Sequence, residues 1–242
     1  GDLNQKATGE TDEDGKLTVP EVAELETHGA YVVGYTDGTF GPDRDMTRSE
    51  AATIFARLLA QHNGERITIP TKTTFPDVPV NAWYAGYVSY LARYGIAVGY
   101  TDGLFHGDEP ITRAEFTAMA VRFFDAYGDG DPAIMENYGG FWDVSPGHWA
   151  AGYIEDAARY GWVVGYGDGT FQADDEITRA EVVTIVNRLL GREADQEYIA
   201  DNPRGLILFP DVSKDYWAYY DILEAANGHT ASMEDAETWL KA

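Results

Sequence analysis

The stretch GYTDGLFHGDEPITRAEF, residues 99–116, contains the two motifs that decide the fold. It begins with Gly-Tyr-x-Asp-Gly-x-Phe and ends with Thr-Arg-x-Glu before an apolar residue. The same two motifs, at the same distance from each other, occur at residues 34–51 and again at 165–182. Self-similarity at a fixed spacing is typical of proteins built from repeated structural units. The chain therefore contains three copies of one structural unit.

The segment that follows each Thr-Arg-x-Glu motif is predicted to be a helix. The threonine takes the N-cap position, and the glutamate three residues later completes a capping box. Apolar residues then recur with helical spacing, as in Phe116, Met119, Ala120 and Phe123. The equivalent positions are apolar in the other copies, so three such helices are expected to share one core.

A second pattern, Phe-x-Asp-Val followed by a tryptophan, begins at Phe75, Phe141 and Phe209. The segments 83–94 and 149–160, which start at these tryptophans, are predicted to form a second helix in each unit. The last copy of the pattern follows the third Thr-Arg-x-Glu, and no complete copy precedes the first Gly-Tyr-x-Asp-Gly. We therefore expect the C-terminal half-repeat to complete the N-terminal one, which removes the end faces that an open stack must cap.

The expected fold is mostly α, with three pseudo-threefold-related helix-loop-helix units around a central three-helix core. The expected division of the chain is an acidic leader over 1–16, a first repeat with an incomplete first half over 17–62, a linker over 63–74, a second repeat over 75–127, a linker over 128–140, a third repeat over 141–192, a linker over 193–208 and the C-terminal half-repeat over 209–242.

Composition excludes several classes of function. The 242 residues include 17 Lys and Arg against 41 Asp and Glu, a formal charge of -24, and no cysteine. Such acidity repels phosphodiester backbones and anionic lipid headgroups, so no nucleic-acid partner is expected. Without cysteine there is no disulfide framework, thiolate zinc site or cysteine nucleophile. No apolar run approaches the ~20 residues of a spanning helix, so membrane insertion is not expected either.

In their order along the chain, Phe-x-Asp-Val, Trp-Ala, Gly-Tyr-x-Asp-Gly-Thr-Phe and Ile-Thr-Arg-Ala-Glu resemble the S-layer homology (SLH) domain, here as a tandem of three from Leu17 to Trp239. The resemblance implies a pseudo-threefold assembly of helices that holds an exported protein on the bacterial cell wall. It implies binding of secondary cell wall polysaccharide, commonly with pyruvate-ketal sugars, and an extracellular, cell-surface location. The alternative is a structural S-layer module that self-associates without specific sugar recognition.

No enzyme or cofactor is expected. A glycosidase needs two carboxylates at a proper separation, but adjacent carboxylates are common by chance in so acidic a chain. No unique pair of carboxylates stands outside the repeats. The chain is therefore interpreted as a non-catalytic module.

Arg48, Arg113 and Arg179 are the residues expected to bind an acidic sugar, each one residue past a helix N-cap. The first turn of a helix offers unpaired N–H groups and the positive end of the helix dipole, and a guanidinium presents a planar fork that suits a carboxylate. The alternative is that each arginine pairs with a local aspartate. The family resemblance favours sugar binding.

Four further residue types in each unit are candidates for saccharide binding. Glycine lets a sugar approach the backbone closely, aspartate binds hydroxyls, tyrosine presents a hydroxyl and tryptophan stacks on a sugar face. The alternative for each is structural, because Asp-Gly forms turns and the tryptophans begin helices beside core-like patterns. For the aspartates and tryptophans this structural interpretation is favoured. The candidates are Gly38, Gly103 and Gly169; Asp37, Asp102 and Asp168; Tyr35, Tyr100 and Tyr166; and Trp83, Trp149 and Trp217.

The acidic N-terminal stretch approximates a calcium-binding EF-hand loop, with Glu10, Asp12, Asp14 and Glu21 as candidate ligands. Glu10 replaces the usual aspartate and Pro20 disturbs the last turn, so a solvated acidic leader is favoured. The five histidines show no helical metal-ligand spacing, and no other metal site is expected.

Overall fold

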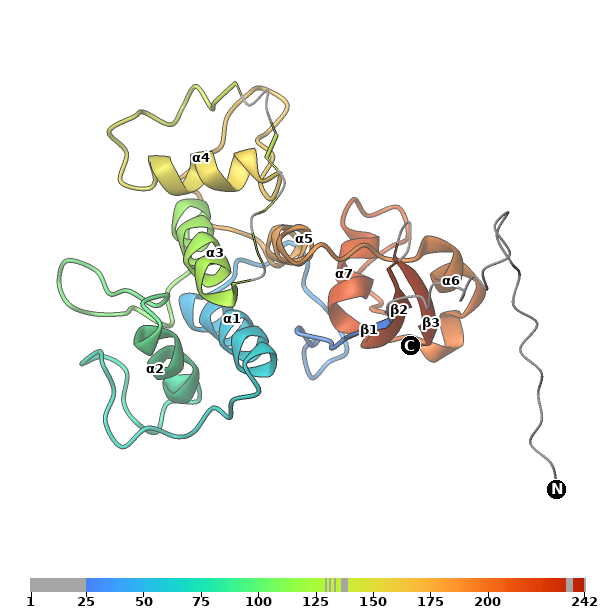
Figure 1. Ribbon diagram of the computed structural model, residues 1–242, viewed down its shortest axis with the longest axis horizontal. Coiled ribbons are helices and arrows are strands. Elements are labelled where there is room, and N and C mark those ends of the chain that lie inside the picture. The colour runs from blue at the N-terminus through green and yellow to red at the C-terminus, as the bar shows by residue number, and fades with distance from the viewer. Residues whose placement is uncertain are drawn as a thin grey trace, which may run out of the picture.

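The computed structural model describes residues 25–128, 130, 132, 134–135, 139–233 and 237–241. Over these residues the chain is mostly helical, as expected, with a small antiparallel sheet of three strands in the order β1-β2-β3 (Figure 1). The elements in chain order are β1 (Leu25–His28), α1 (Arg48–His62), α2 (Ala85–Arg93), α3 (Arg113–Tyr127), α4 (Ala151–Arg159), α5 (Arg179–Leu190), α6 (Gln196–Asp201), the 3-10 helix η1 (Pro203–Gly205), α7 (Tyr219–Ala226), β2 (His229–Ser232) and β3 (Thr238–Lys241).

Helices α1, α3 and α5 begin at the three Thr-Arg-x-Glu motifs, and the predicted capping box is present at each. In α3, the hydroxyl of Thr112 accepts from the amide of Glu115 at 3.2 Å, and the Glu115 carboxylate accepts from the amide of Thr112 at 3.1 Å. The same reciprocal pair opens α1 and α5. These bonds satisfy N–H groups that a helix start otherwise leaves unpaired, so the motif fixes where each helix begins.

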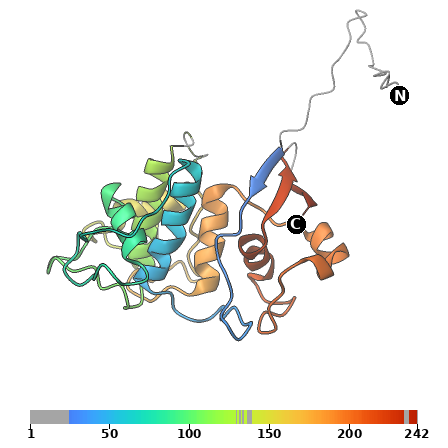
Figure 2. The same cartoon turned by 90° about the horizontal axis from the view of Figure 1, so that it is seen from below.

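The same three helices lie side by side in the centre of the molecule (Figure 2). The ring of Phe55 on α1 lies 5.3 Å from that of Phe116 and 4.9 Å from that of Phe123, both on α3, measured between ring centroids. All three side chains are fully buried, and each such burial contributes about 1.5–3 kcal/mol. Val182 and Val186 of α5 belong to the same buried cluster, so the core expected from the helical spacing is confirmed for all three helices.

Each central helix carries an outer helix. Helix α2 packs on α1, α4 on α3, and α7 on α5 (Figure 1). The predicted start of the outer helices is wrong by two residues, since α2 and α4 begin after Trp83 and Trp149 and not at them. A turn closed by the amide of Ala85 on the carbonyl of Ala82 at 3.0 Å occupies the preceding residues in the first of these units.

The C-terminal half-repeat contacts the N-terminal loop through the aspartate of its Phe-x-Asp-Val motif. The carboxylate of Asp211 accepts from the amide of Phe40 at 2.9 Å and from that of Gly41 at 2.7 Å. The equivalent carboxylates in the other two units are Asp77, which accepts from Phe105 and His106, and Asp143, which accepts from Phe171 and Gln172. The C-terminal half-repeat thus makes with the first loop the contact that the other two copies make within continuous chain.

Contacts between the copies run in a closed cycle. Isolated antiparallel bridges join the first copy to the second, the second to the third and the third to the first, through Thr47 and Pro110, Thr112 and Glu176, and Thr178 and Asp45. This cycle supports the pseudo-threefold arrangement, which stays a prediction.

The sheet and α6 were not expected from the sequence. Strand β1 pairs with β2 along its length, from Leu25 opposite Ser232 to His28 opposite His229. Four-residue strands without apolar alternation give no period-two signal, so their pairing depends on contacts between chain ends far apart in sequence. Helix α6 lies in the segment 193–208 that was interpreted as a linker, and Asp195 caps it by accepting from the amide of Tyr198 at 2.9 Å.

Replacing Asp211 with alanine is expected to lower the free energy of unfolding by about 1–2 kcal/mol, because two hydrogen bonds between the chain ends are lost. Urea denaturation measures the change. Asp215→Ala, an exposed aspartate four residues away, is the matched control and is expected to have little effect. Equal midpoints for the two variants would show that Asp211 does not close the assembly.

Candidate functional site

Three grooves on the surface are lined by the same six residues at equivalent positions of the three copies. Each combines an exposed valine, the tyrosine of Gly-Tyr-x-Asp-Gly, the glutamate of Thr-Arg-x-Glu, a tryptophan and two arginines. Groove 1 (≈ 220 Å³) is lined by Val33, Tyr35, Glu50, Arg57, Trp83 and Arg179. Groove 2 (≈ 460 Å³) is lined by Val98, Tyr100, Glu115, Arg122, Trp149 and Arg48. Groove 3 (≈ 250 Å³) is lined by Val164, Tyr166, Glu181, Arg188, Trp217 and Arg113.

The three arginines predicted as binding residues line the grooves, but they are largely buried and connect neighbouring copies. The Nε of Arg113 donates to the carbonyl oxygen of Phe171 at 2.8 Å, and its guanidinium pairs with Glu181 at 2.8 Å. The equivalent bonds run from Arg48 to Phe105 and from Arg179 to Phe40. Arg113 pairs with a glutamate of the next copy and not with the local aspartate of the alternative interpretation. These side chains therefore have a structural task, and their binding of an acidic sugar stays a prediction.

The groove tyrosines pack against the same arginines. The Cζ of Arg113 lies 4.9 Å from the centroid of the Tyr166 ring, and that of Arg48 lies 4.5 Å from the Tyr100 ring. The Tyr100 hydroxyl donates to Glu115 at 2.6 Å. Burial, together with this carboxylate, raises the pKa of Tyr100 above its usual value, so the hydroxyl keeps its proton at neutral pH. The tyrosine thus holds both the arginine and the capping glutamate in place.

The favoured interpretation of the groove tryptophans as core residues is wrong. Trp83, Trp149 and Trp217 are 60%, 57% and 61% exposed. The residue after each tryptophan is the buried one, as Ala150 shows, because the tryptophan precedes the first turn of the outer helix. Each indole therefore presents apolar surface to solvent at the edge of a groove. The exposed Val33, Val98 and Val164 add to this apolar surface.

Each groove also contains a second arginine that was not predicted from the sequence. Arg57, Arg122 and Arg188 follow the glutamate of Thr-Arg-x-Glu by seven residues in all three copies. This spacing places glutamate and arginine two turns apart on one helix face, and it was the signal that could have found them. The Nε of Arg122 donates to the Tyr153 hydroxyl at 3.2 Å, with Cζ 4.7 Å from the ring centroid. Arg57 and Arg188 are exposed, so each of these grooves has a guanidinium that reaches solvent.

The predicted loop glycines and aspartates form turns, and none of them lines a groove. Gly103 has φ +80, and its amide donates to the carbonyl of Tyr100 at 2.9 Å. The Asp37 carboxylate accepts from the hydroxyl and amide of Thr39, and these bonds hold its pKa below the usual value. The remaining members of this set, Gly38, Gly169, Asp102 and Asp168, take the same places in their turns. The turn predicted for Asp-Gly is confirmed.

The first glycine of Gly-Tyr-x-Asp-Gly occupies a position at which a side chain would not fit. A Cβ on Gly99 would lie 2.8 Å from Cε1 of Phe75 and 2.9 Å from the carbonyl oxygen of Leu104. Gly34 and Gly165 face the equivalent phenylalanines, Phe209 and Phe141. Because the glycine has no side chain, the Gly-Tyr-x-Asp-Gly loop packs directly on the phenylalanine of Phe-x-Asp-Val.

The candidate calcium ligands Glu10, Asp12, Asp14 and Glu21, and the acidic leader that contains most of them, lie outside the described residues. Within the described part of the chain, no helix is both long and apolar enough to cross a bilayer.

Comparison with known proteins gives consistent results. The sequence profile of the S-layer homology domain matches three segments, at residues 11–52, 74–117 and 140–183. Cell surface glycoprotein 1 of Acetivibrio thermocellus is 36% identical over 86% of this chain and 9% of its own length. The cellulosome-anchoring protein of the same organism is 34% identical over 90% of this chain and 46% of its own length. The chain therefore spans less than half the length of each of these relatives.

Proposed function

The chain belongs to the S-layer homology family, and from this premise we propose that its three grooves bind an acidic cell wall polysaccharide and so anchor a larger protein. Its location is the bacterial cell surface, in keeping with relatives that are a cell surface glycoprotein and a cellulosome-anchoring protein. Anchoring of a protein at the surface requires a partner in the wall. Polysaccharide is the partner whose chemistry the grooves suit.

The observation that carries the proposal is the threefold recurrence of one set of groove residues. An exposed indole beside an exposed valine offers a flat apolar surface for the face of a sugar ring. Arginine beside it offers several donors in a fixed plane. A packing role alone does not require a tryptophan that is more than half exposed in every copy.

The acidic substituent of the sugar is proposed to be a carboxylate, such as that of a pyruvate ketal. Each groove contains two guanidinium groups and one carboxylate among its described lining residues, so its local charge opposes the overall charge of -24. Screening over about 8 Å at physiological salt limits the reach of the bulk charge, so short-range geometry decides recognition. In this proposal the buried arginine and the second arginine of each groove share the carboxylate.

The module is proposed to be non-catalytic. Each groove contains one carboxylate among its described lining residues, and that carboxylate is already held in a capping box. A glycosidase needs two carboxylates about 5–9.5 Å apart across the scissile bond. Three weak sites on one repeating polymer instead gain affinity through effective concentration, which is what an anchor needs.

Arg122→Gln is expected to lower the affinity for an acidic wall polysaccharide fragment by about tenfold, because one hydrogen bond to a charged group is lost from groove 2. Calorimetry with a purified fragment at two salt concentrations measures the loss and a weaker salt dependence. Arg66→Gln, which removes an exposed arginine outside the three grooves, is the control. An equal effect of the two substitutions would assign the attraction to general charge and not to the groove.

The alternative, a lattice module that self-associates without sugar recognition, makes a different prediction. Sedimentation would then show association that depends on concentration and persists in the Arg122→Gln variant, while calorimetry with the polysaccharide fragment would show no heat. That combination of results would replace the proposal.

A further inference from the structure

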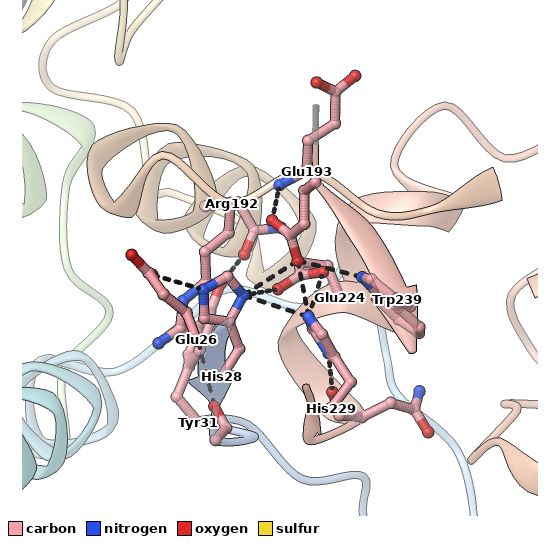
Figure 3. A network of polar contacts seen from close by, with 12 residues as sticks. Glu26, His28, Tyr31, Arg192, Glu193, Glu224, His229 and Trp239 are labelled. Carbon is pink, nitrogen blue, oxygen red and sulfur yellow. Dashed lines mark hydrogen bonds and ion pairs between the residues drawn. The ribbon is translucent and has the colours of Figure 1, made fainter. Parts of the chain in front are cut away.

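Two histidines and two glutamates from both ends of the chain meet in one buried cluster, outside the three grooves (Figure 3). The cluster consists of His28 at the end of β1, Glu224 on α7, His229 at the start of β2 and Glu237 just before β3. The exposed fractions of the four side chains are 7%, 0%, 0% and 2% in that order. Four ionisable groups so deeply buried need a common explanation.

The distances within the cluster match the size of a tetrahedral cation site. One atom from each of the four residues lies within 4.8 Å of all the others. The Nδ1 of His28 lies 3.2 Å from Nε2 of His229 and 3.0 Å from Oε1 of Glu237, and that Oε1 lies 2.7 Å from Nε2 of His229. Glu224 oxygens lie 3.7 Å and 3.5 Å from the same two nitrogens. Tetrahedral zinc with ligands at about 2.0–2.1 Å separates them by roughly 3.3 Å.

The outer contacts orient both imidazoles toward the centre of the cluster. His229 uses Nδ1 to donate to the carbonyl oxygen of Asn227 at 2.9 Å, which leaves Nε2 facing the other ligands. His28 uses Nε2 toward Glu26 at 3.3 Å, which leaves its Nδ1 facing inward. Metal-binding histidines typically have such a partner on the second nitrogen, because it fixes tautomer and ring orientation.

The remaining ligand contacts follow the same plan. The second oxygen of Glu237 accepts from the amide of Glu193 at 2.8 Å, so this carboxylate is held from behind. Trp239 donates from its indole nitrogen to the first oxygen at 3.1 Å, and its ring stacks on His229 with centroids 3.9 Å apart. The labelled side chains of Figure 3 enclose the cluster from several elements.

Glu224 provides the independent sign that a ligand belongs here. Both of its carboxylate oxygens are buried, and within the described structure neither has a hydrogen-bond partner. A buried carboxylate without a hydrogen bond is costly, and a bound cation removes that cost.

We propose that His28, Glu224, His229 and Glu237 form a structural binding site for one divalent transition cation, with zinc as the best fit. Two imidazole nitrogens and two carboxylate oxygens suit zinc, which accepts nitrogen and oxygen ligands in four-coordinate closed sites. A site with four protein ligands leaves no open position, so its role is to stabilise the fold and not to perform chemistry.

The position of the site within the fold explains what the cation does. In the second unit, the chain continues from α2 into the Gly-Tyr-x-Asp-Gly loop that begins at Gly99. A hydrogen bond from the amide of Ile96 to the carbonyl of Leu91, at 3.0 Å, closes this connection. The unit that contains α7 is built from the two ends of the chain, and the equivalent bond joins Tyr31 to Ala225 without covalent continuity. The cluster joins the chain ends beside this break. The positions equivalent to Glu224 in the other units, seven residues after the tryptophan, are Tyr90 and Asp156. Among the described residues, no second cluster of this kind is present.

Zinc added to chelator-treated protein tests the proposal. We expect a competition titration with a chromophoric chelator to show that each chain binds one zinc ion. At a free zinc concentration about 100 times Kd, linkage should raise the thermal midpoint by roughly 5–10 °C. X-ray absorption should show two imidazoles and two oxygen ligands, all near 2.0–2.1 Å. Magnesium at the same concentration should leave the midpoint unchanged, because it prefers six oxygen ligands.

Two variants and a matched control make the test specific. Glu224→Gln and His229→Gln should each lower zinc affinity roughly 100-fold or more, since the loss of an outer-shell partner alone typically costs about 10–100-fold. Glu224→Gln replaces a buried carboxylate that has no hydrogen bond with an amide of the same shape, so the metal-free variant should stay folded. His106→Gln removes a half-buried histidine outside the cluster that contacts Asp102 and Glu109, and it should keep the full zinc response.

The opposite results would overturn the proposal. Absence of stoichiometric zinc binding to the unsubstituted chain would do so, as would a thermal shift that Glu224→Gln retains in full. If His106→Gln abolished zinc binding, the ion would be bound near His106, and the buried cluster would not be the zinc site.

Discussion

Replacing Gly165 with alanine is expected to lower the free energy of unfolding by about 3 kcal/mol, at the upper end of what overpacking usually costs. The added Cβ would collide with the Phe141 ring and with the carbonyl oxygen of Thr170. The ring has little room to move, because it already packs on Phe171 with centroids 5.2 Å apart, and the carbonyl accepts from the amide of Tyr166 at 2.8 Å. Urea denaturation should show a lower midpoint with an unchanged slope.

The same loop supplies the control for this prediction. Gly167 lies two residues further along, has no positive φ, and a Cβ there would have no atom within 4 Å. Gly167→Ala is therefore expected to be neutral or slightly stabilising. If the two alanine variants unfolded at the same urea concentration, close packing of the loop on the phenylalanine would not be what the first glycine of the motif provides.

Replacing Trp83, Trp149 and Trp217 together with alanine is expected to lower affinity for the wall polysaccharide by about 1000-fold. Loss of one indole face from a sugar site is expected to cost about 1.4 kcal/mol, a factor of about ten per groove. When three grooves hold one polymer the factors multiply, because each later contact is intramolecular. Binding to immobilised polysaccharide, measured for the single and triple variants, gives the three factors separately.

Exposure of the three indoles keeps the triple variant folded, so binding and stability are separable. Surface substitutions away from structural contacts usually change stability by about 0.5 kcal/mol or less. Trp142→Ala is the matched control, because Trp142 is 75% exposed and lies outside the three grooves. A triple variant that bound within threefold of the unsubstituted chain would remove the tryptophans from the site.

Local signals predicted most of the fold. The Thr-Arg-x-Glu motif alone predicts where a helix begins, because both partners of a capping box lie within four residues. Helical spacing then identified the buried face, and Phe55, Phe116 and Phe123 meet as the pattern indicates. The offset between the two motif sets also indicated that the C-terminal half-repeat joins the first loop, a contact that Asp211 makes.

The site was harder to predict because exposure is decided by where a helix begins. A shift of two residues at the start of α4 moved Trp149 from an expected core position to the rim of a groove. Arg122 was visible only as a spacing of seven residues from Glu115, which gains meaning once the groove is known. His28 and His229 lie 201 residues apart, and no spacing rule within one helix brings them together.

Retention on purified bacterial sacculi, measured before and after removal of their secondary cell wall polysaccharide, tests the central claim most directly. Three grooves that recognise an acidic polysaccharide predict tight, saturable binding to intact sacculi and its loss from extracted ones. The triple tryptophan variant should be lost from both. Equal retention of the unsubstituted chain on intact and extracted sacculi would contradict the account.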